Sequence, residues 1–562
     1  MSEWKNTLYY GDNLSILREY IANESVDFIY LDPPFNSNRN YNVLFKNEQG
    51  MDSQAQIVAF KDTWHWDMTA QATYEELVEI APPHVVTMVS ALKTMLGTNQ
   101  VMAYLVMMTV RLLELHRVLK PTGSLYLHCD TTASHYLRIV LDAIFGADNF
   151  LNEIIWERFN FHADAKRWGR VHDVILFYAK RSSQLTYDIQ RREYNEKYFR
   201  THFKQDENGR YYQLDNATAK GQGPARMFFG KLLEPPKKTH WRWSQENIDR
   251  LIEEGRIVLT GAGRPRVRRY FDEMEGHPIG DVWTDIPEIN SMAKERLGYP
   301  TQKPVALLER ILNASTNEGD LVLDPFCGCG TTIHAAQKLK RRWIGIDITH
   351  LAIALQKYRL KDAFNLAEKE DYLVIGEPKD VEAARHLAQA DRYQFQWWAL
   401  SLIQAQPVGG EMGKKQGKKG KDRGIDGLIM FLDDPKKPVK KLIVQVKSGK
   451  VSSGDIRDLA GTIEREQAAI GVFITLEPPS QEMQTEAASA GSYSSEWAIG
   501  GDAKRKYPKI QVLTIAELLA GASVQMPPTA RTYKKSQKET VQDGVQEHIA
   551  LQENTSEWTP SF

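Results

Sequence analysis

Short apolar runs alternate with amphipathic segments of helical length along the first part of the chain. Apolar runs of strand length occupy 26–31, 124–128 and 174–178, and apolar residues recur at helical spacing over 104–118. Spacing of three to four residues is typical of a helix packed on one face, whereas a short continuous apolar run is typical of a buried strand. Strands that alternate with helices favour a parallel sheet covered by helices. We therefore predict an α/β core.

The alternation stops near residue 181 and resumes near residue 298, which divides the chain into several parts. Residues 1–180 and 291–365 are predicted to form the α/β core, and 181–290 a separate region between its two halves. Residues 366–522 are predicted to form a smaller α/β domain. Residues 523–562 are polar and too poor in apolar residues to fold alone, so we predict a disordered tail there.

Composition indicates a soluble globular protein. The chain has 562 residues, of which 42% are apolar and 25% charged, as is common for folded proteins. No apolar run is long enough to span a membrane and the first residues lack the apolar segment of a signal peptide, so we predict a cytoplasmic protein. Three cysteines, Cys129, Cys327 and Cys329, are too few and too irregularly spaced for a disulfide framework or a zinc site.

The segment 224–270 is basic although the whole chain is nearly neutral. It holds eleven Lys and Arg against five Asp and Glu, while the net charge of the chain is -1. Aromatic residues are interspersed with these charges, at 228, 229, 241, 243 and 270. Basic side chains contact phosphates and aromatic rings stack on bases. The segment therefore favours nucleic-acid binding over the alternative, a basic face that only contacts water.

An acidic residue, two prolines and an aromatic residue directly follow the strand 26–31. They are Asp32, Pro33, Pro34 and Phe35. Open α/β sheets bind ligands at the carboxyl ends of their strands, and consecutive prolines restrict the backbone there. A carboxylate and a fixed carbonyl can accept hydrogen bonds from an exocyclic amino group while the ring stacks on a flat base. This loop therefore predicts a site that binds the exocyclic amino group of adenine or cytosine.

A second loop with candidate chemistry follows the strand 321–324. It begins at Asp324 and leads through glycines into a helix, and the next strand ends in Asp347, near the spacing at which Rossmann-type folds place a carboxylate on a ribose. The sequence of this loop lacks the glycine pattern of dinucleotide sites and the Gly-Lys-Thr of phosphate loops, which argues against NAD and ATP. A ligand with a sugar and a carboxylate but no phosphate, such as S-adenosyl-L-methionine, fits better.

Together these motifs resemble those of the amino-group DNA methyltransferases, which carry an Asp/Ser/Asn-Pro-Pro-aromatic motif and a Phe-x-Gly-x-Gly motif. Here the first motif precedes the second, an order similar to that of the β class. The resemblance covers about residues 1–365. It implies a Rossmann-like fold, S-adenosyl-L-methionine as cofactor, and double-stranded DNA as substrate. The region 181–290 would recognise the target, whose base would be flipped out of the duplex.

The resemblance also implies roles for individual residues. The motif at 32–35 would be catalytic, and Asp at its first position favours N6 of adenine over the alternative, N4 of cytosine, because members with Ser there more commonly act on cytosine. The residues implied to bind the cofactor are Asp12 near the adenine, Thr301, Gln302, Lys303 and Pro304 at the methionine end, and Asp324, Phe326, Gly328, Gly330, Thr331 and Asp347.

Residues 366–522 hold a further candidate site. Asp426 opens one predicted strand, and Gln445 and Lys447 share a face of the next. A carboxylate and an amide oxygen can hold Mg2+, and an ammonium can assist an attacking water. The pattern resembles the PD-(D/E)XK nucleases, specifically the Mrr-like restriction branch. This resemblance implies that Asp426 and Gln445 bind the metal and that Lys447 is catalytic.

Two interpretations of the whole chain remain open at this point. Such nucleases commonly carry a Glu on the preceding helix, where this sequence has Gln396. The chain is either a bifunctional restriction-modification enzyme that methylates and cuts DNA, or a methyltransferase whose third domain only binds DNA or a partner. A third interpretation, in which both halves of the chain are inactive binding scaffolds, is disfavoured because the motifs at Asp32 and Asp324 look intact. The recognised DNA sequence and the oligomeric state, a homodimer included, stay open.

Overall fold

The computed structural model describes residues 4–34, 40–46, 52–61, 65–158, 168–194, 196–290, 293, 295–297, 299, 301–407, 424–431, 439–495 and 505–527. These residues group into two compact units, 1–188 with 281–562 and Ile189–Gly280. Phe35 and most of the predicted tail, 528–562, lie outside the described residues. None of the described helices is long and apolar enough to cross a membrane.

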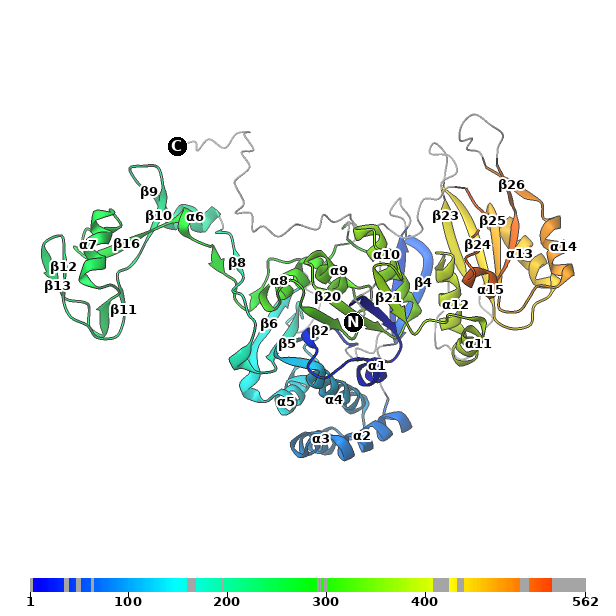
Figure 1. Cartoon of the computed structure of the whole chain (residues 1–562), viewed down its shortest axis with the longest axis horizontal. Helices are drawn as coiled ribbons and strands as arrows, with labels where there is room; N and C mark the ends of the chain where they lie inside the picture. The colour runs from blue at the N-terminus through cyan, green and yellow to red at the C-terminus, as the bar shows by residue number, and fades with distance from the viewer. Residues whose placement is uncertain are drawn as a thin grey trace. The chain divides into compact units, whose positions relative to one another are not determined.

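The first unit is built around a nine-stranded sheet (Figure 1). Every pairing in it is parallel except those of β7, which is antiparallel to both of its neighbours. The prediction of a Rossmann-like α/β core is confirmed by this topology. The strands in spatial order are β18 (Val282–Trp283), β6 (Phe150–Glu157), β7 (His172–Ala179), β5 (Leu119–Cys129), β2 (Val26–Leu31), β19 (Leu321–Asp324), β20 (Arg342–Asp347), β1 (Asn6–Tyr10) and β21 (Tyr372–Ile375).

Strands from distant parts of the sequence meet in the middle of this sheet. β2 pairs with β19 in parallel, with Phe28 opposite Val322 and Ile29 opposite Leu323. The loops that follow the two strands must therefore emerge at the same edge of the sheet. This pairing brings together the two motifs that the sequence separates by almost three hundred residues.

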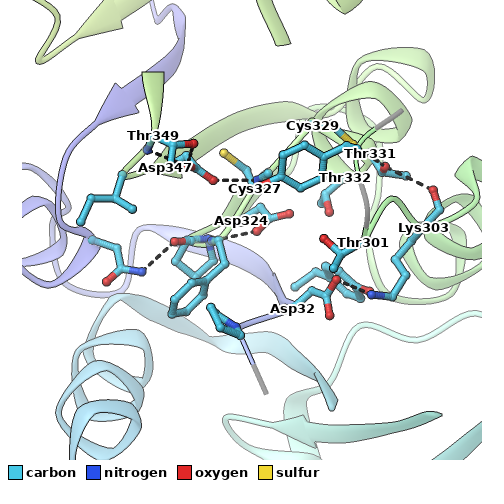
Figure 2. Close-up of a pocket in the computed structure, with 18 of the residues that line it drawn as sticks. Asp32, Thr301, Lys303, Asp324, Cys327, Cys329, Thr331, Thr332, Asp347 and Thr349 are labelled. Carbon is cyan, nitrogen blue, oxygen red and sulfur yellow. Dashed lines mark hydrogen bonds and ion pairs between the residues drawn. The ribbon is translucent and has the colours of Figure 1, made fainter. Parts of the chain in front are cut away.

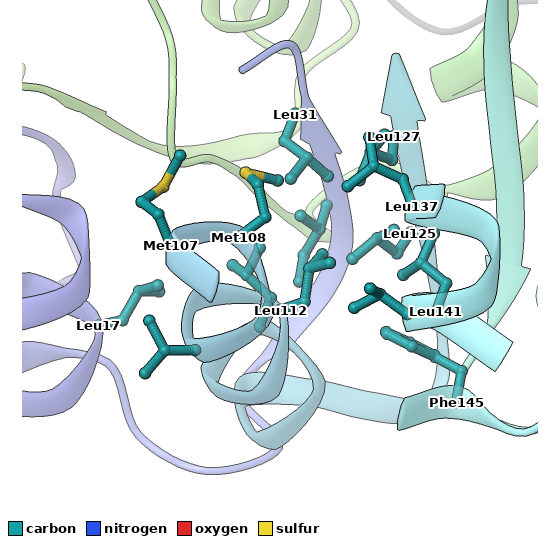
Figure 3. Close-up of a cluster of buried hydrophobic side chains, with 14 of the residues drawn as sticks. Leu17, Leu31, Met107, Met108, Leu112, Leu125, Leu127, Leu137, Leu141 and Phe145 are labelled. Atoms are coloured by element: carbon teal, nitrogen blue, oxygen red, sulfur yellow. The ribbon is translucent and has the colours of Figure 1, made fainter. Parts of the chain in front are cut away.

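Helices cover both faces of the sheet. In Figure 1, α1, α4 and α5 lie on one side of it and α8, α9 and α10 on the other. The bounds of these helices are α1 (Asn13–Tyr20), α4 (Gln100–Val118), α5 (Ser134–Phe145), α8 (Val305–Ser315), α9 (Thr331–Lys338) and α10 (His350–Phe364). Leu112 of α4 and Leu141 of α5 pack against Leu125 and Leu127 of β5 in the main apolar cluster (Figure 3).

The segment 40–96 contains regular structure that the hydrophobic pattern did not predict. It forms two helices, α2 (Met68–Ile80) and α3 (Pro83–Leu96), after the antiparallel pair β3 (Asn40–Lys46) and β4 (Asp52–Lys61). Asp67 caps α2 by accepting a hydrogen bond from Ala70 N, and Pro83 stands at the first turn of α3, where a proline loses no helical hydrogen bond.

The second unit, Ile189–Gly280, has its own small core. Phe228, Trp241, Ile248 and Ile257 are buried together in it. It contains the four-stranded sheet β15 (Ile257–Leu259), β16 (Pro265–Tyr270), β10 (Tyr211–Asn216) and β9 (Lys204–Gln205), and the pairs β11 (Thr218–Lys220) with β14 (Thr239–Trp241), β12 (Arg226–Phe228) with β13 (Lys231–Leu233), and β8 (Arg191–Arg192) with β17 (His277–Pro278). Its helices are α6 (Glu196–His202) and α7 (Gln245–Glu253).

The C-terminal part of the first unit is a five-stranded sheet with helices on both faces. Neighbouring residues of β24 belong to different apolar clusters. Val444 is in the same cluster as Trp398 of α12, and Ile443 is in the same cluster as Ile456 of α13. The sheet order is β22 (Gln406–Pro407), β23 (Gly427–Phe431), β24 (Lys440–Lys447), β25 (Ile470–Thr475) and β28 (Ile510–Thr514). The other elements are α11 (Val381–Ala390), α12 (Arg392–Leu402), α13 (Ser453–Arg465), α14 (Gln481–Ser489), α15 (Ile515–Leu519) and the pair β26 (Ser492–Ser494) and β27 (Lys506–Pro508).

Two helices, α11 and α12, meet at Asp391 instead of forming one continuous helix. Asp391 separates them in an extended conformation, and its side chain accepts hydrogen bonds from Tyr393 N and Gln394 N. An Asp at this position satisfies backbone donors that a continuous helix would have paired internally. The side chain thus both ends α11 and starts α12.

Candidate functional site

The loops after β2 and β19 line one pocket, together with the residues that precede α1, α8 and α10. Figure 2 shows Asp32, Asp324 and Asp347 directed into the space between these loops. The predicted site residues that line it are Asp12, Asp32, Pro34, Thr301, Gln302, Lys303, Asp324, Phe326, Gly328, Thr331 and Asp347. Pro33, Pro304 and Gly330 belong to the same loops without lining the pocket, and Phe35 is not among the described residues.

The loop after β19 owes its shape to two glycines and one carboxylate. Asp324 Oδ1 accepts a hydrogen bond from Phe326 N at 3.0 Å, which turns the chain at the strand end. Gly328 and Gly330 both have positive φ, at 48° and 77°, a region that other residues enter only at a cost. A Cβ atom on Gly330 would also lie 2.7 Å from Cγ of Gln356. Gln356 in turn donates to Gly328 O at 2.8 Å, so the glycines allow α10 to support the loop.

Asp347 is fixed against the same loop from the next strand. Its Oδ2 accepts from Gly328 N at 3.0 Å, and its Oδ1 accepts from Thr349 N and from Thr349 Oγ1, both at 2.8 Å. Gly11 N donates to Asp347 O at 3.0 Å, which joins β1 to this edge. A carboxylate at this strand end is therefore held rigidly at the wall of the pocket.

Asp12 lies at the adjoining wall and is held by an arginine that the sequence did not indicate. Arg111 Nη2 lies 2.7 Å from Asp12 Oδ2, and Arg111 Nε donates to Asn13 Oδ1 at 2.6 Å. Asn13 Nδ2 donates to Pro325 O at 2.8 Å. The start of α1 is thereby tied both to α4 and to the loop after β19.

Asp32 faces Lys303 across the pocket. Lys303 Nζ lies 2.5 Å from Asp32 Oδ2, and both side chains are largely buried (Figure 2). Thr331 Oγ1 donates to Lys303 O at 3.2 Å. The segment 301–304 is thus connected to the loop after β2 by an ion pair and to the start of α9 by a hydrogen bond.

A buried polar chain beneath the pocket was missed by sequence reasoning. Tyr30 Oη lies 2.8 Å from His128 Nδ1, and His128 Nε2 lies 3.0 Å from Asp173 Oδ2. Burial, followed by the charge of Lys303, lowers the pKa of His128, so the ring is neutral and has one N–H. That proton is donated to Asp173, so Nδ1 accepts from Tyr30. The signal available in the sequence was a His and an Asp inside strands that are otherwise apolar.

The pocket is electrostatically suited to a cation. Burial, with smaller contributions from the charges of Asp32 and Asp347, raises the pKa of Asp324 to about 7. Burial also raises the pKa of Asp347. A nearby positive charge stabilises the ionised form of carboxyl groups whose pKa is raised by burial. A positively charged ligand in the pocket would therefore stabilise the ionised forms of Asp324 and Asp347.

Replacing Asp324 should change how stability depends on pH. The folded protein holds the Asp324 proton more tightly than the unfolded chain, so this group lowers stability as pH rises from about 4 to about 7. We expect Asp324→Asn to raise the melting temperature of the ligand-free protein at about pH 8 and to have little effect near pH 4. Differential scanning fluorimetry across pH tests this. A pH-independent difference between variant and wild type would contradict it.

Comparison with known proteins assigns this fold and pocket to a family. The model of the N6/N4 DNA methylase family, described as DNA methylase, matches residues 26–357, more than half of the chain. The chain belongs to this family. The match contains both loops of the pocket and the whole of the unit Ile189–Gly280.

Two curated relatives are similar to more than half of the chain. The chain is 30% identical over 295 residues to the type II methyltransferase M.EcaI of Enterobacter cloacae, a match that covers 52% of this chain and 65% of that protein. It is 26% identical over 350 residues to the StyLTI Mod subunit, of a type III restriction-modification enzyme of Salmonella typhimurium, covering 59% of this chain and 50% of that one. The chain thus spans less than two thirds of the length of both.

Two further similarities concern an adenine enzyme and solved structures. The chain is 25% identical over 365 residues to the DNA adenine methyltransferase YhdJ of Escherichia coli, covering 65% of this chain and 85% of that one. Solved structures include M1.HpyAVI in complex with SAM (15% identity, TM-score 0.28, 63% of this chain and 99% of that one covered) and the cytosine-N4-specific PvuII DNA methyltransferase (13% identity, TM-score 0.31, 64% and 88% covered).

The C-terminal sheet of the chain matches a second family model. The model described as NACHT-associated inactive Restriction Endonuclease 1 matches residues 406–520. The predicted restriction-endonuclease-like domain is therefore present, and the Mrr-like branch stays a prediction.

The structure connects Asp426 to Gln396 and to the backbone of β24. Asp426 Oδ1 accepts from Gln396 Nε2 at 2.9 Å and Oδ2 accepts from Val446 N at 2.7 Å, while Gln445 Nε2 donates to Gly424 O. Lys447 ends the same strand, β24, that carries Gln445. Within the described part of the chain, no three His, Cys, Asp or Glu side chains form a group that could hold a metal ion.

Proposed function

We propose that this protein is a site-specific DNA methyltransferase that uses S-adenosyl-L-methionine to methylate an exocyclic amino group. The observation that supports this most is the pairing of β2 with β19, which brings Asp32 and Asp324 to one pocket. A carboxylate that can accept from an amino group and a loop suited to a cationic nucleoside then line the same pocket. S-adenosyl-L-methionine supplies an electrophilic methyl group on a sulfonium when it is bound.

In this proposal the catalytic groups act on the base. The carboxylate of Asp32 and the carbonyl of Pro33 accept hydrogen bonds from the amino group, which makes the nitrogen lone pair available, and Phe35 stacks on the ring. Asp32 and the Pro33 carbonyl would hold the amino nitrogen toward the methyl group that bound S-adenosyl-L-methionine would supply, with its sulfur as the leaving group. The nitrogen then loses one proton, for which Asp32 is the nearest proposed acceptor.

The residues proposed to hold the cofactor surround the other end of the pocket. Asp347 is placed to accept from ribose hydroxyls, since its carboxylate stands at the strand end where Rossmann-type folds bind a ribose. Asp12 and Phe326 are proposed beside the adenine. Thr331 opens α9, whose backbone N–H groups favour a carboxylate, so we place the methionine end there, beside the segment 301–304.

We propose N6 of adenine as the acceptor, with N4 of cytosine as the alternative. Asp at the first position of the motif supports adenine, as does the likeness to a relative named as a DNA adenine methyltransferase. The unit Ile189–Gly280 is proposed to bind double-stranded DNA and to recognise the target sequence. Its basic and aromatic composition supports this part of the proposal.

The decisive experiment identifies the methylated base. The purified protein is incubated with unmethylated genomic DNA and S-adenosyl-L-methionine labelled in the methyl group, and the digested nucleosides are separated. We expect label in 6-methyladenine, and long-read sequencing of the same DNA should locate it in one sequence context. Label in 4-methylcytosine would select the alternative, and no label in any nucleoside would refute the proposal.

For the C-terminal domain we propose DNA or partner binding without cleavage. Both carboxylate oxygens of Asp426 accept protein N–H groups, and one of these donors is the amide of Gln396, where an active nuclease would need another acidic metal ligand. The description of the matching model as inactive supports this choice over cleavage.

We expect the protein not to bind Mg2+ at this domain and not to cut DNA. Isothermal titration with Mg2+ should give the same heats for the wild type and for Asp426→Asn, and supercoiled plasmid of any methylation state should remain uncut. Mg2+-dependent nicking that disappears in Asp426→Asn and Lys447→Met would overturn this and support the bifunctional restriction-modification enzyme instead.

A further inference from the structure

A hairpin in the unit Ile189–Gly280 has an unusual residue at its tip. β12 and β13 pair with Phe228 opposite Lys231, so Phe229 and Gly230 form a two-residue turn. Both turn residues have positive φ, 48° and 74°. Two-residue hairpin turns with this geometry favour Asn, Asp or Gly at the first position, and a bulky side chain there is unfavourable. A residue kept in a disfavoured conformation suggests a role for its side chain.

The hairpin exposes a small apolar surface around this tip. Met227 is 40% exposed, Phe229 47% and Leu232 67%, whereas the intervening Phe228 is 1% exposed. Met227 and Leu232 are directly opposite each other in the strand pair, so their side chains lie on one face of the hairpin. Clusters of exposed apolar side chains commonly mark a binding surface.

The base of the hairpin is held firmly, so the tip is presented in a defined position. Gln245 at the start of α7 bonds Met227 twice, accepting from its N at 2.8 Å and donating to its O at 3.0 Å. On the other strand Leu233 O accepts from Trp241 Nε1 at 3.1 Å. The ring of Phe228 packs 4.7 Å from that of Trp241. A rigid support of this kind lowers the entropic cost of using the tip in binding.

The charges beside the hairpin identify its partner as DNA. Arg226 and Lys231 belong to its strands, and Lys237 and Lys238 follow it, with Glu234 the one acidic residue between 224 and 240. An apolar tip flanked by basic residues is complementary to a base stack flanked by phosphates. A protein partner would need an acidic rim to match the same surface.

We propose that Phe229 is a wedge that enters the DNA base stack and helps to unstack the target base. Met227 and Leu232 would support the ring from the side, while Arg226 and Lys231 contact the phosphates. Flipping a base costs the free energy of its stacking and pairing, and an inserted apolar side chain offsets part of that cost. This inference rests on the proposed function, since it requires a base to be flipped.

The test replaces Phe229 with the residue that the turn itself favours. Phe229→Asn suits a positive φ, so the variant should be at least as thermally stable as the wild type. Leu259→Asn is the matched control, because Leu259 is also an exposed apolar residue of this unit but belongs to β15. The probe is a duplex with the sequence found to be methylated in cells, carrying 2-aminopurine beside the target base, whose fluorescence rises when the neighbouring base unstacks.

We expect the wild type and Leu259→Asn to raise the fluorescence equally and Phe229→Asn to give at most about a fifth of that rise at saturating protein. Methylation by Phe229→Asn should fall about tenfold on paired DNA and recover on a duplex in which the target base is mispaired, since a mispaired base is easier to flip. A fluorescence rise in Phe229→Asn equal to that of the wild type would overturn the proposal. If methylation by Phe229→Asn stays low on the mispaired duplex, the proposal is also wrong. Phe229 would then have a different partner or a purely structural role. If the wild type neither binds nor methylates the duplex, the proposed function fails instead.

Discussion

Asp32→Asn should abolish methyl transfer while leaving cofactor affinity within about threefold of the wild type. The amide keeps the shape of the carboxylate but loses its negative charge, so it no longer stabilises the charge that develops on the amino nitrogen. Removing a group of this kind commonly lowers the rate by about 10²–10⁴-fold. Single-turnover transfer to DNA measures the rate, and titration with S-adenosyl-L-homocysteine measures the binding.

A second variant separates catalysis from folding in this experiment. Asp32 forms an ion pair with Lys303, whose side chain is largely buried, and loss of one member of such a pair leaves a charge without compensation. Asp32→Asn should therefore lower the melting temperature, and the double variant Asp32→Asn with Lys303→Met should restore it without restoring methyl transfer. Methyl transfer by Asp32→Asn at the wild-type rate would refute the assigned role.

Gly330→Ala should weaken cofactor binding by more than about tenfold, although the site is not altered chemically. An alanine at φ of 77° is unfavourable by about 1–2 kcal/mol, and its Cβ would lie 2.7 Å from Cγ of Gln356. Gln356 must then move, and it would lose its hydrogen bond to Gly328 O, which helps to shape the loop beside Asp347. Calorimetric titration with S-adenosyl-L-homocysteine and thermal melting report the two effects.

Gly319 offers a closely matched control for this variant. It has a φ of 81°, and no heavy atom lies within 4 Å of the position of an added Cβ. Gly319→Ala therefore imposes similar backbone strain in the same domain without the contact to Gln356. Equal cofactor affinity in Gly319→Ala and Gly330→Ala would show that the supporting role assigned to Gln356 is wrong.

The parts of the pocket that could be predicted are those in which chemistry follows directly after a strand. Asp32, Asp324 and Asp347 each stand at a strand end, and the apolar runs before them are short and continuous. Parallel strands bring such ends to one edge of a sheet, so the sequence could indicate each motif as a candidate binding loop, whereas the pairing of β2 with β19 that joins them comes from the fold. The sequence could not predict the pairing of Asp32 with Lys303, because the position of a long side chain depends on packing between segments far apart in the chain.

The parts that were missed have partners on other elements. His128 and Asp173 belong to neighbouring strands, and nothing in either strand alone indicates that they are hydrogen-bonded. Arg111 is one polar residue in a helix that is otherwise mostly buried, and only the fold shows that it reaches Asp12. The break between α11 and α12 depends on one side chain, Asp391, whose capping hydrogen bonds outweigh the continued helical pattern around it.

The short pairing of β8 with β17 has a consequence for how this protein can evolve. His277 lies opposite Arg192 and Pro278 opposite Arg191, and Ile279 N donates to Gln190 O at 2.9 Å. The chain therefore enters and leaves the unit Ile189–Gly280 through two adjacent strands. An inserted segment whose two ends lie side by side can be replaced by another through changes at only two junctions. Such exchange would alter the sequence read on DNA while every residue of the pocket stayed the same.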